Sequence, residues 1–104
     1  METERTRTFN DYVQGEKPVL VDFFATWCGP CKAMTPIIDD LKHRLGETAH
    51  VLKVDVDRNP QAAEALGVQG VPTLIVFKQG RVVWRRSGVV AADELERVLR
   101  QHGE

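Results

Sequence analysis

Short, uninterrupted runs of hydrophobic residues alternate along the chain with stretches in which hydrophobic positions recur every three or four residues. The first run, residues 19–25, is broken only by Asp22, a composition typical of a central strand that is buried on both faces. Later runs are bounded by turn-forming residues, so they also predict strands. These strands are residues 51–56, 73–77 and 82–86, of which the last two form a hairpin through a turn at residues 78–81.

Helical spacing separates the predicted strands. Hydrophobic residues recur from Met34 to Leu45, and Gly46 is a natural end for that helix. Pro36 lies inside this helix and predicts a kink. Further helices are predicted from Asn59 and Pro60 to Gly67, around Leu95, Val98 and Leu99, and, as a short segment, around Phe9, Tyr12 and Val13.

The order of these elements predicts an α/β fold. A strand, a helix and a second strand imply a parallel pair joined by a right-handed crossover, and the hairpin adds antiparallel strands to the same sheet. We therefore expect a central mixed β-sheet of four to five strands flanked by helices. No strand can be assigned within residues 1–14, which leaves one edge of the sheet open. No repeat or linker divides the chain, so residues 1–104 are expected to form a single domain.

Composition and charge narrow the choice of function. The chain has 42% hydrophobic residues, 28% charged residues and a formal net charge of -1, an ordinary balance for a globular protein. Because Lys and Arg are not clustered, nothing favours nucleic acid or an anionic membrane as a partner. Residues 1–8 hold no hydrophobic stretch typical of a secretory signal, and no run approaches the length of a membrane span. We therefore expect a cytoplasmic monomer, in which a cysteine pair is more often catalytic or metal-binding than a permanent crosslink.

The two cysteines, Cys28 and Cys31, lie where the first strand ends and the long helix begins. Unpaired backbone N–H groups and the helix dipole stabilise a thiolate at such a position, so we expect a lowered pKa for Cys28. Cys31 follows one helical turn later, within disulfide distance. Pro30 fixes the first turn and Gly29 allows a sharp bend. We expect both sulfurs to be accessible to other proteins.

Asp22 is the second candidate for chemistry. An ionised carboxylate inside a buried strand costs several kcal/mol unless it is paired or protonated. Burial is therefore expected to raise the pKa of Asp22. A raised pKa suits a group that accepts a proton from Cys31 as that thiol becomes a nucleophile.

The segment Trp27-Cys28-Gly29-Pro30-Cys31-Lys32 resembles the active-site motif of the thioredoxin family. The resemblance continues in order along almost the whole chain after residue 15. It implies the thioredoxin fold, with the cysteine pair at one tip, and an enzyme that reduces protein disulfides. The other matching segments are Val21-Asp22-Phe23, Pro36, Gly70-Val71-Pro72-Thr73, Phe77-Lys78-Gln79-Gly80 and Gly88.

The resemblance also implies catalytic roles for individual residues. Cys28 is expected to attack a client disulfide, and Cys31 is expected to resolve the mixed disulfide. Asp22 is expected to accept the proton of Cys31. Lys53, on the adjacent predicted strand, matches the lysine that thioredoxins place near this carboxylate.

A surface for client proteins follows from the same resemblance. In thioredoxins the peptide bond equivalent to Val71-Pro72 is cis and faces the cysteines, which leaves the backbone of Val71 free to pair with an extended client segment. The resemblance further implies reduction of the oxidised protein by an NADPH-dependent flavoprotein, thioredoxin reductase, while the chain itself carries no cofactor motif. The expected client surface consists of Trp27, Gly29, Pro30, Val56, Val71, Pro72, Gly88 and Val89.

The chain departs from the family pattern at two places. Phe24 stands where many thioredoxins carry a second tryptophan, so the fluorescence change on reduction is expected to depend mainly on Trp27. The N-terminal segment is short, and no counterpart of the family's first strand can be assigned in it.

The cysteine pair could also belong to a zinc site or form a permanent disulfide. Cys28 and Cys31 followed by His43 and His50 come near the spacing of a zinc finger, but the six residues between the histidines exceed the usual range of about three to five. A permanent disulfide would close too short a loop to stabilise the fold. The alternative functions are a disulfide oxidase or isomerase of an oxidising compartment, and a thioredoxin-like binding module without redox activity.

The histidines and the last predicted strand are expected to have no role in catalysis. His43, His50 and His102 are expected to be exposed. The last strand is expected to be a solvated edge of the sheet, with Trp84, Arg85 and Arg86 on it.

Overall fold

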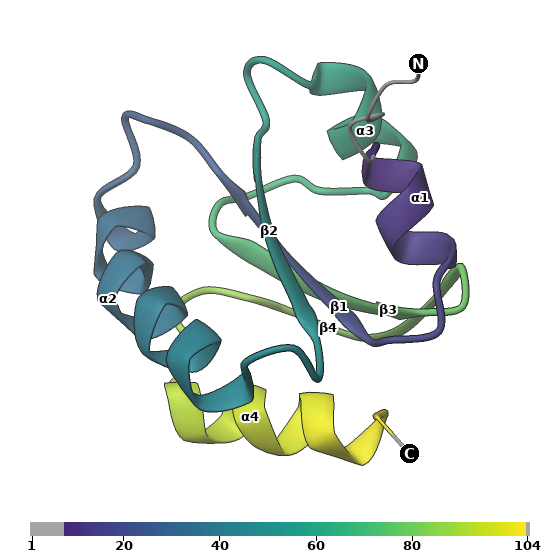
Figure 1. Ribbon diagram of the computed structural model, residues 1–104. Helices are drawn as coiled ribbons and strands as arrows, with labels where there is room; N and C mark the ends of the chain where they lie inside the picture. Colours follow the sequence, from purple (N-terminus) through teal and green to yellow (C-terminus); the bar gives the residue numbers. More distant parts are fainter. Residues whose placement is uncertain (1–7, 104) are drawn as a thin grey trace, which may run out of the picture.

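The computed structural model describes residues 8–103, in which a β-sheet lies between two layers of helices (Figure 1). The predicted helices and strands are all present, with ends shifted by one or two residues. The question of a strand before the first helix concerns residues outside the described range. In chain order the elements are α1 (Phe9–Gln14), β1 (Val19–Phe24), α2 (Gly29–Leu45), β2 (His50–Asp55), α3 (Pro60–Ala65), β3 (Thr73–Lys78), β4 (Arg81–Ser87) and α4 (Ala92–Gln101).

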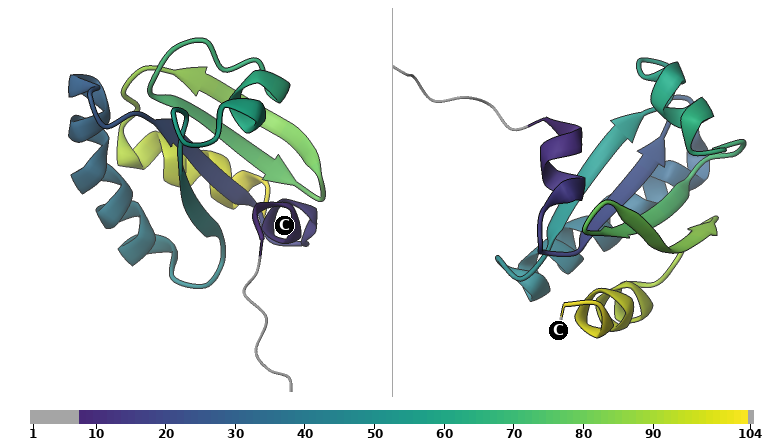
Figure 2. Two further views of the ribbon diagram at one scale, coloured as in Figure 1. Left: turned by 90° about the horizontal axis from the view of Figure 1, so that it is seen from above. Right: turned by 90° about the vertical axis from the view of Figure 1, so that its right-hand side faces the viewer.

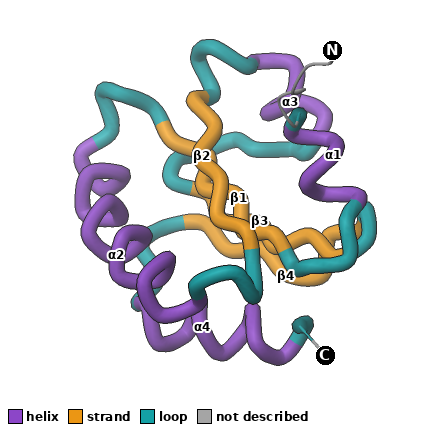
Figure 3. The backbone as a smooth tube through the Cα atoms, viewed as in Figure 1, coloured by secondary structure: helices purple, strands orange, loops and turns teal. Residues whose placement is uncertain are grey.

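The described strands form one mixed sheet in the order β2-β1-β3-β4 (Figure 3). β1 and β2 are parallel, as a crossover through α2 requires, whereas β1 and β3, and β3 and β4, are antiparallel. The expectation of a mixed sheet flanked by helices is therefore confirmed. Because β1 lies inside the sheet, its C-terminal end carries the cysteine segment out of the centre of the molecule.

The hairpin between β3 and β4 depends on two residues with left-handed backbone. Gln79 has φ 52° and Gly80 has φ 83°, the combination that a two-residue type I′ turn requires. The Gly80 N–H donates a hydrogen bond of 2.7 Å to the Val13 carbonyl at the end of α1. The turn therefore also fixes α1 against the sheet.

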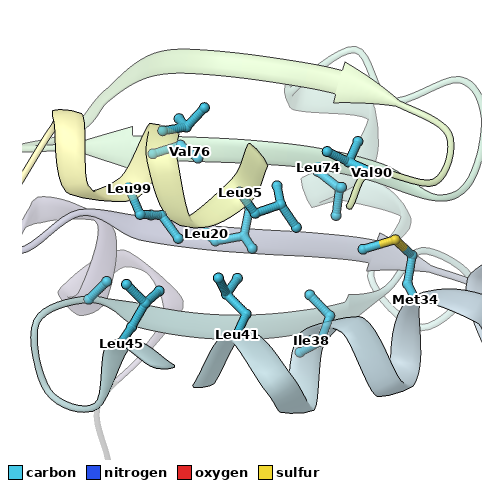
Figure 4. Close-up of a cluster of buried hydrophobic side chains, with 12 residues drawn as sticks. Leu20, Met34, Ile38, Leu41, Leu45, Leu74, Val76, Val90, Leu95 and Leu99 are labelled. Atoms are coloured by element: carbon cyan, nitrogen blue, oxygen red, sulfur yellow. The ribbon is translucent and has the colours of Figure 1, made fainter. Parts of the chain in front are cut away.

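Successive residues of β1 supply two separate cores, one on each face of the sheet. Leu20 packs with α2 and α4, while Val19, Val21 and Phe23 pack with α1 and with residues that follow α3 (Figures 1 and 2). Asp22 lies two residues after Leu20 and therefore points to the face covered by α2. The core under α2 and α4, shown in Figure 4, consists of Leu20, Met34, Ile38, Leu41, Leu45, Ala49, Leu74, Val76, Val90, Leu95, Val98 and Leu99.

Substitution of one core valine provides a direct test of this packing. Val76 is fully buried, so Val76→Ala is expected to lower the free energy of unfolding by about 2 kcal/mol or more. Val82, 45% exposed on the neighbouring strand, is the matched control, and Val82→Ala is expected to cost less than about 1 kcal/mol. Urea denaturation measures both, and equal losses would contradict the assigned burial.

The interpretation of β4 as a solvated edge needs correction. Trp84 is half-buried and packs against the core under α4. Arg85 and Arg86 are exposed, but each has a defined partner: Arg85 donates to the carbonyls of residues 66 and 67, and Arg86 pairs with Glu94 of α4 at 2.8 Å. These contacts join segments far apart in sequence, which hydrophobic patterning does not reveal.

The histidine predictions also change. His43 is exposed as expected, but His50 and His102 are half-buried. The His50 ring makes an edge contact with Tyr12, with ring centroids 4.9 Å apart. At the start of α3, the Asn59 side chain donates to the Asp55 carbonyl and accepts no capping hydrogen bond from the N–H groups of the helix.

Candidate active site

Cys28 and Cys31 form a disulfide at the start of α2, where the chain leaves the buried end of β1. Cys28 is the N-cap residue, and its Sγ accepts a hydrogen bond of 3.1 Å from the backbone N–H of Cys31. Pro30 occupies the first turn, and the Cα atoms of the two cysteines are 5.3 Å apart. The predicted placement of one sulfur at the helix N-terminus and the other one turn later is confirmed.

The accessibility of the sulfurs is lower than the sequence suggested. In the disulfide form Cys28 is 3% exposed and Cys31 is 6% exposed, so the expectation that both are open to other proteins is wrong for this form. They pack with Ala25 and against Phe24, Val56 and Val71. Trp27, beside them, is 70% exposed. A client must therefore fit closely around Trp27 to reach Cys28.

Asp22 lies in the buried centre of β1 and is 1% exposed. Neither carboxylate oxygen has a hydrogen-bond partner among the described residues. Desolvation raises the pKa of Asp22 from 3.8 to about 6, and the positive charge of Lys53 opposes part of that rise. Burial is thus the larger effect, and Asp22 changes its protonation state close to neutral pH.

Lys53 is paired with Asp22 in the register of β1 and β2. Its Nζ lies 4.8 Å from the centroid of the Phe24 ring, a cation–π contact, and no salt bridge joins it to Asp22. Lys53 therefore acts on the carboxylate through space, without a direct hydrogen bond.

A cavity of about 210 Å³ lies on the α2 side of the cysteines. Cys31 and Lys53 both line it, and the hydroxyl-bearing residues Thr26 and Thr35 contribute polar groups that suit water. The two threonines belong to no recognisable motif, because their proximity depends on how α2 packs on β1. The remaining lining residues are Phe24, Ala25 and Lys32.

On the other side of Cys28 lies a shallow apolar groove of about 100 Å³. Val71 precedes a cis proline, Pro72, and its carbonyl oxygen is 3.6 Å from Cys28 Sγ. The structure thus confirms the cis bond beside the cysteines. The groove is lined by Trp27, Val56, Val68, Gln69, Gly70 and Val71.

Of the predicted client surface, Trp27, Val56 and Val71 line this groove. Val89 is 51% exposed, and the Gly88 N–H donates a 2.8 Å hydrogen bond to the Pro72 carbonyl. The structure adds Val68 and Gln69, which precede the Gly70-Val71-Pro72-Thr73 segment and belong to no motif of their own. The structure also adds Asp57, which accepts a 2.8 Å hydrogen bond from the Trp27 indole N–H across thirty positions of sequence.

Trp27 is expected to report the redox state of the cysteines. Its indole lies next to the disulfide and is held by Asp57, so reduction is expected to change its fluorescence strongly. Trp27→Phe is expected to remove most of the redox-dependent change. Trp84→Phe, at a tryptophan on the last strand, is the control and is expected to retain it. Emission spectra before and after dithiothreitol distinguish the two, and a full change in Trp27→Phe would contradict the assignment.

Metal binding finds no support in the described residues. His43 lies on α2 and His50 on β2, and no group of three or more His, Cys, Asp or Glu side chains in residues 8–103 is arranged to hold an ion.

None of the helices within residues 8–103 has the length and hydrophobicity that a membrane span requires.

Thiol–disulfide oxidoreductases exchange electrons through a cysteine pair at the start of a helix, which is the arrangement that Cys28 and Cys31 form here. Comparison with known proteins agrees. The thioredoxin family model matches residues 1–101. The chain is 42% identical to thioredoxin of Alicyclobacillus acidocaldarius over 91 residues, which cover 88% of this chain and 87% of the relative. It is 46% identical to thioredoxin of Chlamydia muridarum over 84 residues, 81% of each chain.

A solved structure shows the same relationship. A thioredoxin variant from Halobacterium salinarum superimposes with a TM-score of 0.82 at 38% identity, covering 90% of this chain and 81% of that one. The chain therefore belongs to the thioredoxin family.

Proposed function

We propose that this protein reduces disulfide bonds in client proteins through a cycle between the Cys28–Cys31 dithiol and disulfide. The observation that carries the proposal is the position of Cys28 at the N-cap of α2, with its sulfur accepting the Cys31 N–H beside the apolar groove. The same backbone donor that contacts the disulfide sulfur would stabilise a thiolate in the reduced form. A stabilised thiolate is the species that attacks a disulfide.

The reaction has two displacement steps. The Cys28 thiolate attacks one sulfur of the client disulfide, a new S–S bond forms, and the other client sulfur leaves as a thiolate that takes a proton from water. Cys31 then loses its proton and attacks Cys28 Sγ, which releases the second client sulfur. Two electrons pass to the client, and Cys28 and Cys31 end as a disulfide.

Asp22 is proposed as the group that accepts the Cys31 proton. With a pKa raised to about 6, its carboxylate is a stronger base than an ordinary aspartate at neutral pH. Water in the cavity lined by Cys31 and Lys53 would take up the proton of Cys31 and pass it to Asp22, which is buried and does not itself line the cavity. Lys53 would limit the rise in the pKa of Asp22. Charge on Lys53 thus keeps part of Asp22 ionised and ready to act.

Clients are proposed to bind in the groove as extended segments. The Val71 backbone lies beside Cys28, and the apolar walls lack the charged side chains that would select one sequence. The residues proposed to contact clients are Trp27, Gly29, Pro30, Val56, Val71, Pro72, Gly88 and Val89.

The cycle requires an electron source, since each turnover leaves the protein oxidised. We propose an NADPH-dependent thioredoxin reductase as that partner, because relatives of this chain are thioredoxins. We also propose that the protein acts in the cytoplasm, because thiols are kept reduced there and a disulfide reductase suits that compartment. We propose that it acts as a monomer.

Insulin reduction and the redox potential test the direction of the reaction. With dithiothreitol as electron source, the protein is expected to accelerate insulin precipitation. Equilibration with a reference dithiol is expected to place the Cys28–Cys31 potential near the roughly -270 mV that is typical of thioredoxin. A potential well above that of the glutathione pool would indicate the alternative, an oxidase or isomerase. No acceleration and no reversible disulfide would indicate a binding module without redox activity.

A further inference from the structure

The segment between α3 and β3, residues 66–72, forms one wall of the groove beside Cys28. Val68, Gln69, Gly70 and Val71 line that groove, yet the segment contains no regular secondary structure. The start of the loop bonds back to α3: the Gly67 N–H donates to the Glu64 carbonyl at 3.0 Å, and the Val68 N–H donates to the Ala63 carbonyl at 2.9 Å. Leu66 and Val68 also pack against the core on the α1 and α3 face. The further bonds that hold the loop come from β3 and β4.

The end of this loop nearest β3 is held by polar groups of β3 and β4. Thr73 Oγ1 donates to the Gly70 carbonyl at 2.7 Å, and the Thr73 and Ser87 hydroxyls are 3.1 Å apart. The Gly88 N–H donates to the Pro72 carbonyl at 2.8 Å. Residues on or directly after β4 therefore fix the part of the loop that contains the cis proline.

The other end of the loop is held by Arg85 of β4. Its Nη1 donates to the Leu66 carbonyl at 2.7 Å and its Nη2 donates to the Gly67 carbonyl at 3.3 Å. These carbonyls lie just beyond the last turn of α3, where backbone oxygens lack helical partners and negative partial charge accumulates. α3 has no basic residue in its own last turn, so Arg85 supplies the positive charge from another strand.

The register of the sheet explains why Arg85 reaches α3 and its neighbour does not. Arg85 is paired with Ile75, whose side chain belongs to the core on the α1 and α3 face. Arg86 is paired with Leu74 of the opposite core and forms its ion pair with Glu94 of α4. Two adjacent, exposed arginines thus serve opposite faces of the sheet. Of the two, only Arg85 contacts the loop, at Leu66 and Gly67, directly before the residues that line the groove.

We propose that Arg85 is a positioning residue for client binding, which holds the start of loop 66–72 so that the groove keeps its shape. The inference rests on the proposed function of the groove as the client site. Arg85 does not contact the cysteines, so its loss should weaken binding of protein clients and leave the thiol chemistry unchanged. Lysine at this position retains the charge and one of the two hydrogen bonds, so it should restore part of the effect.

Steady-state kinetics of Arg85→Met, Arg85→Lys and the control Arg86→Met test this proposal. With insulin as substrate, Arg85→Met is expected to raise KM by about threefold to tenfold with kcat within about twofold, and Arg85→Lys is expected to lie between it and the parent. Arg86→Met removes the same charge and is expected to leave KM within about twofold. The rate with a small aromatic disulfide, which does not fill the groove, should stay unchanged in all three. Hydrogen exchange of the Gly67 and Val68 amides, which donate to the Glu64 and Ala63 carbonyls, should accelerate in Arg85→Met only.

An unchanged KM in Arg85→Met, or an equal rise in Arg86→Met, would overturn the proposal, the second result indicating charge steering. An equal loss of rate on the small disulfide would also overturn it, because Arg85 would then act on the cysteines. If the parent protein fails to reduce insulin, the proposed function is contradicted instead. Hydrogen exchange still distinguishes the two failures, since equal protection of the Gly67 and Val68 amides in both methionine variants overturns the role of Arg85 by itself.

Discussion

Cys31→Ser is expected to lower the turnover of protein disulfides by about a thousandfold or more and to trap the client as a mixed disulfide. Cys28 remains at the helix N-terminus and still attacks the client, but no second sulfur is present one turn later to release it. The adduct is expected to accumulate with one client per protein. Mass spectrometry and non-reducing electrophoresis measure the amount of this adduct, and dithiothreitol should release the client by reducing the mixed disulfide.

Cys28→Ser is the matched variant for this experiment. It removes the attacking sulfur and keeps Cys31, so neither turnover nor a trapped client is expected. The hydroxyl can still accept the backbone hydrogen bond at the N-cap, and the fold should persist. A client trapped on Cys31 in the absence of Cys28 would show that the two roles are reversed.

Asp22→Asn is expected to stabilise the protein at neutral pH while slowing resolution of the mixed disulfide. The folded pKa of about 6 exceeds the ordinary 3.8, so the carboxyl favours the folded state below pH 3.8 and loses that contribution as pH rises through about 6. The shift corresponds to about 3 kcal/mol, which is the expected increase in the advantage of Asn over Asp between pH 3 and pH 8. Urea denaturation across this range measures it.

Kinetics provide the second half of the Asp22 test. Without a buried base, Cys31 is expected to resolve the mixed disulfide about 10-fold to 100-fold more slowly at pH 7. Asp39→Asn, at an exposed carboxylate of α2, is the control and should change neither the pH dependence of stability nor the rate. An Asp22→Asn protein that is as fast as its parent would remove Asp22 from the mechanism.

The sheet and its flanking helices could be predicted from sequence because each element carries its own periodicity. The run at β1 indicated burial on both faces, and the spacing from Met34 to Leu45 indicated the helix that covers one of them. The order of the strands in the sheet is harder to predict from the sequence. The β1 and β3 pairing joins residues fifty or more positions apart, and local patterning says little about which strands become neighbours.

The chemistry of the site was predictable where it is local, and partly so elsewhere. Cys28, Cys31 and Asp22 stood out because a cysteine at a helix start and a carboxylate in a buried strand both violate the ordinary preferences of folding. The contacts of Trp27 with Asp57 and of Arg85 with Leu66 leave no such mark. Both contacts depend on the path of the loops in the folded protein. An exposed polar side chain has many possible partners, and the local sequence does not indicate which one it will contact.

The crosslink between Cys28 and Cys31 spans a sequence separation of three, so it joins no distant parts of the chain. Folding and oxidation nevertheless form a closed thermodynamic cycle. Any preference of the native structure for one oxidation state must reappear as a difference in unfolding free energy between the two forms. For a two-electron couple, about 1.4 kcal/mol of that difference corresponds to roughly 30 mV. Denaturation of the oxidised and the reduced protein in parallel therefore measures how far folding shifts the reduction potential of this cysteine pair from its value in an unfolded peptide of the same sequence.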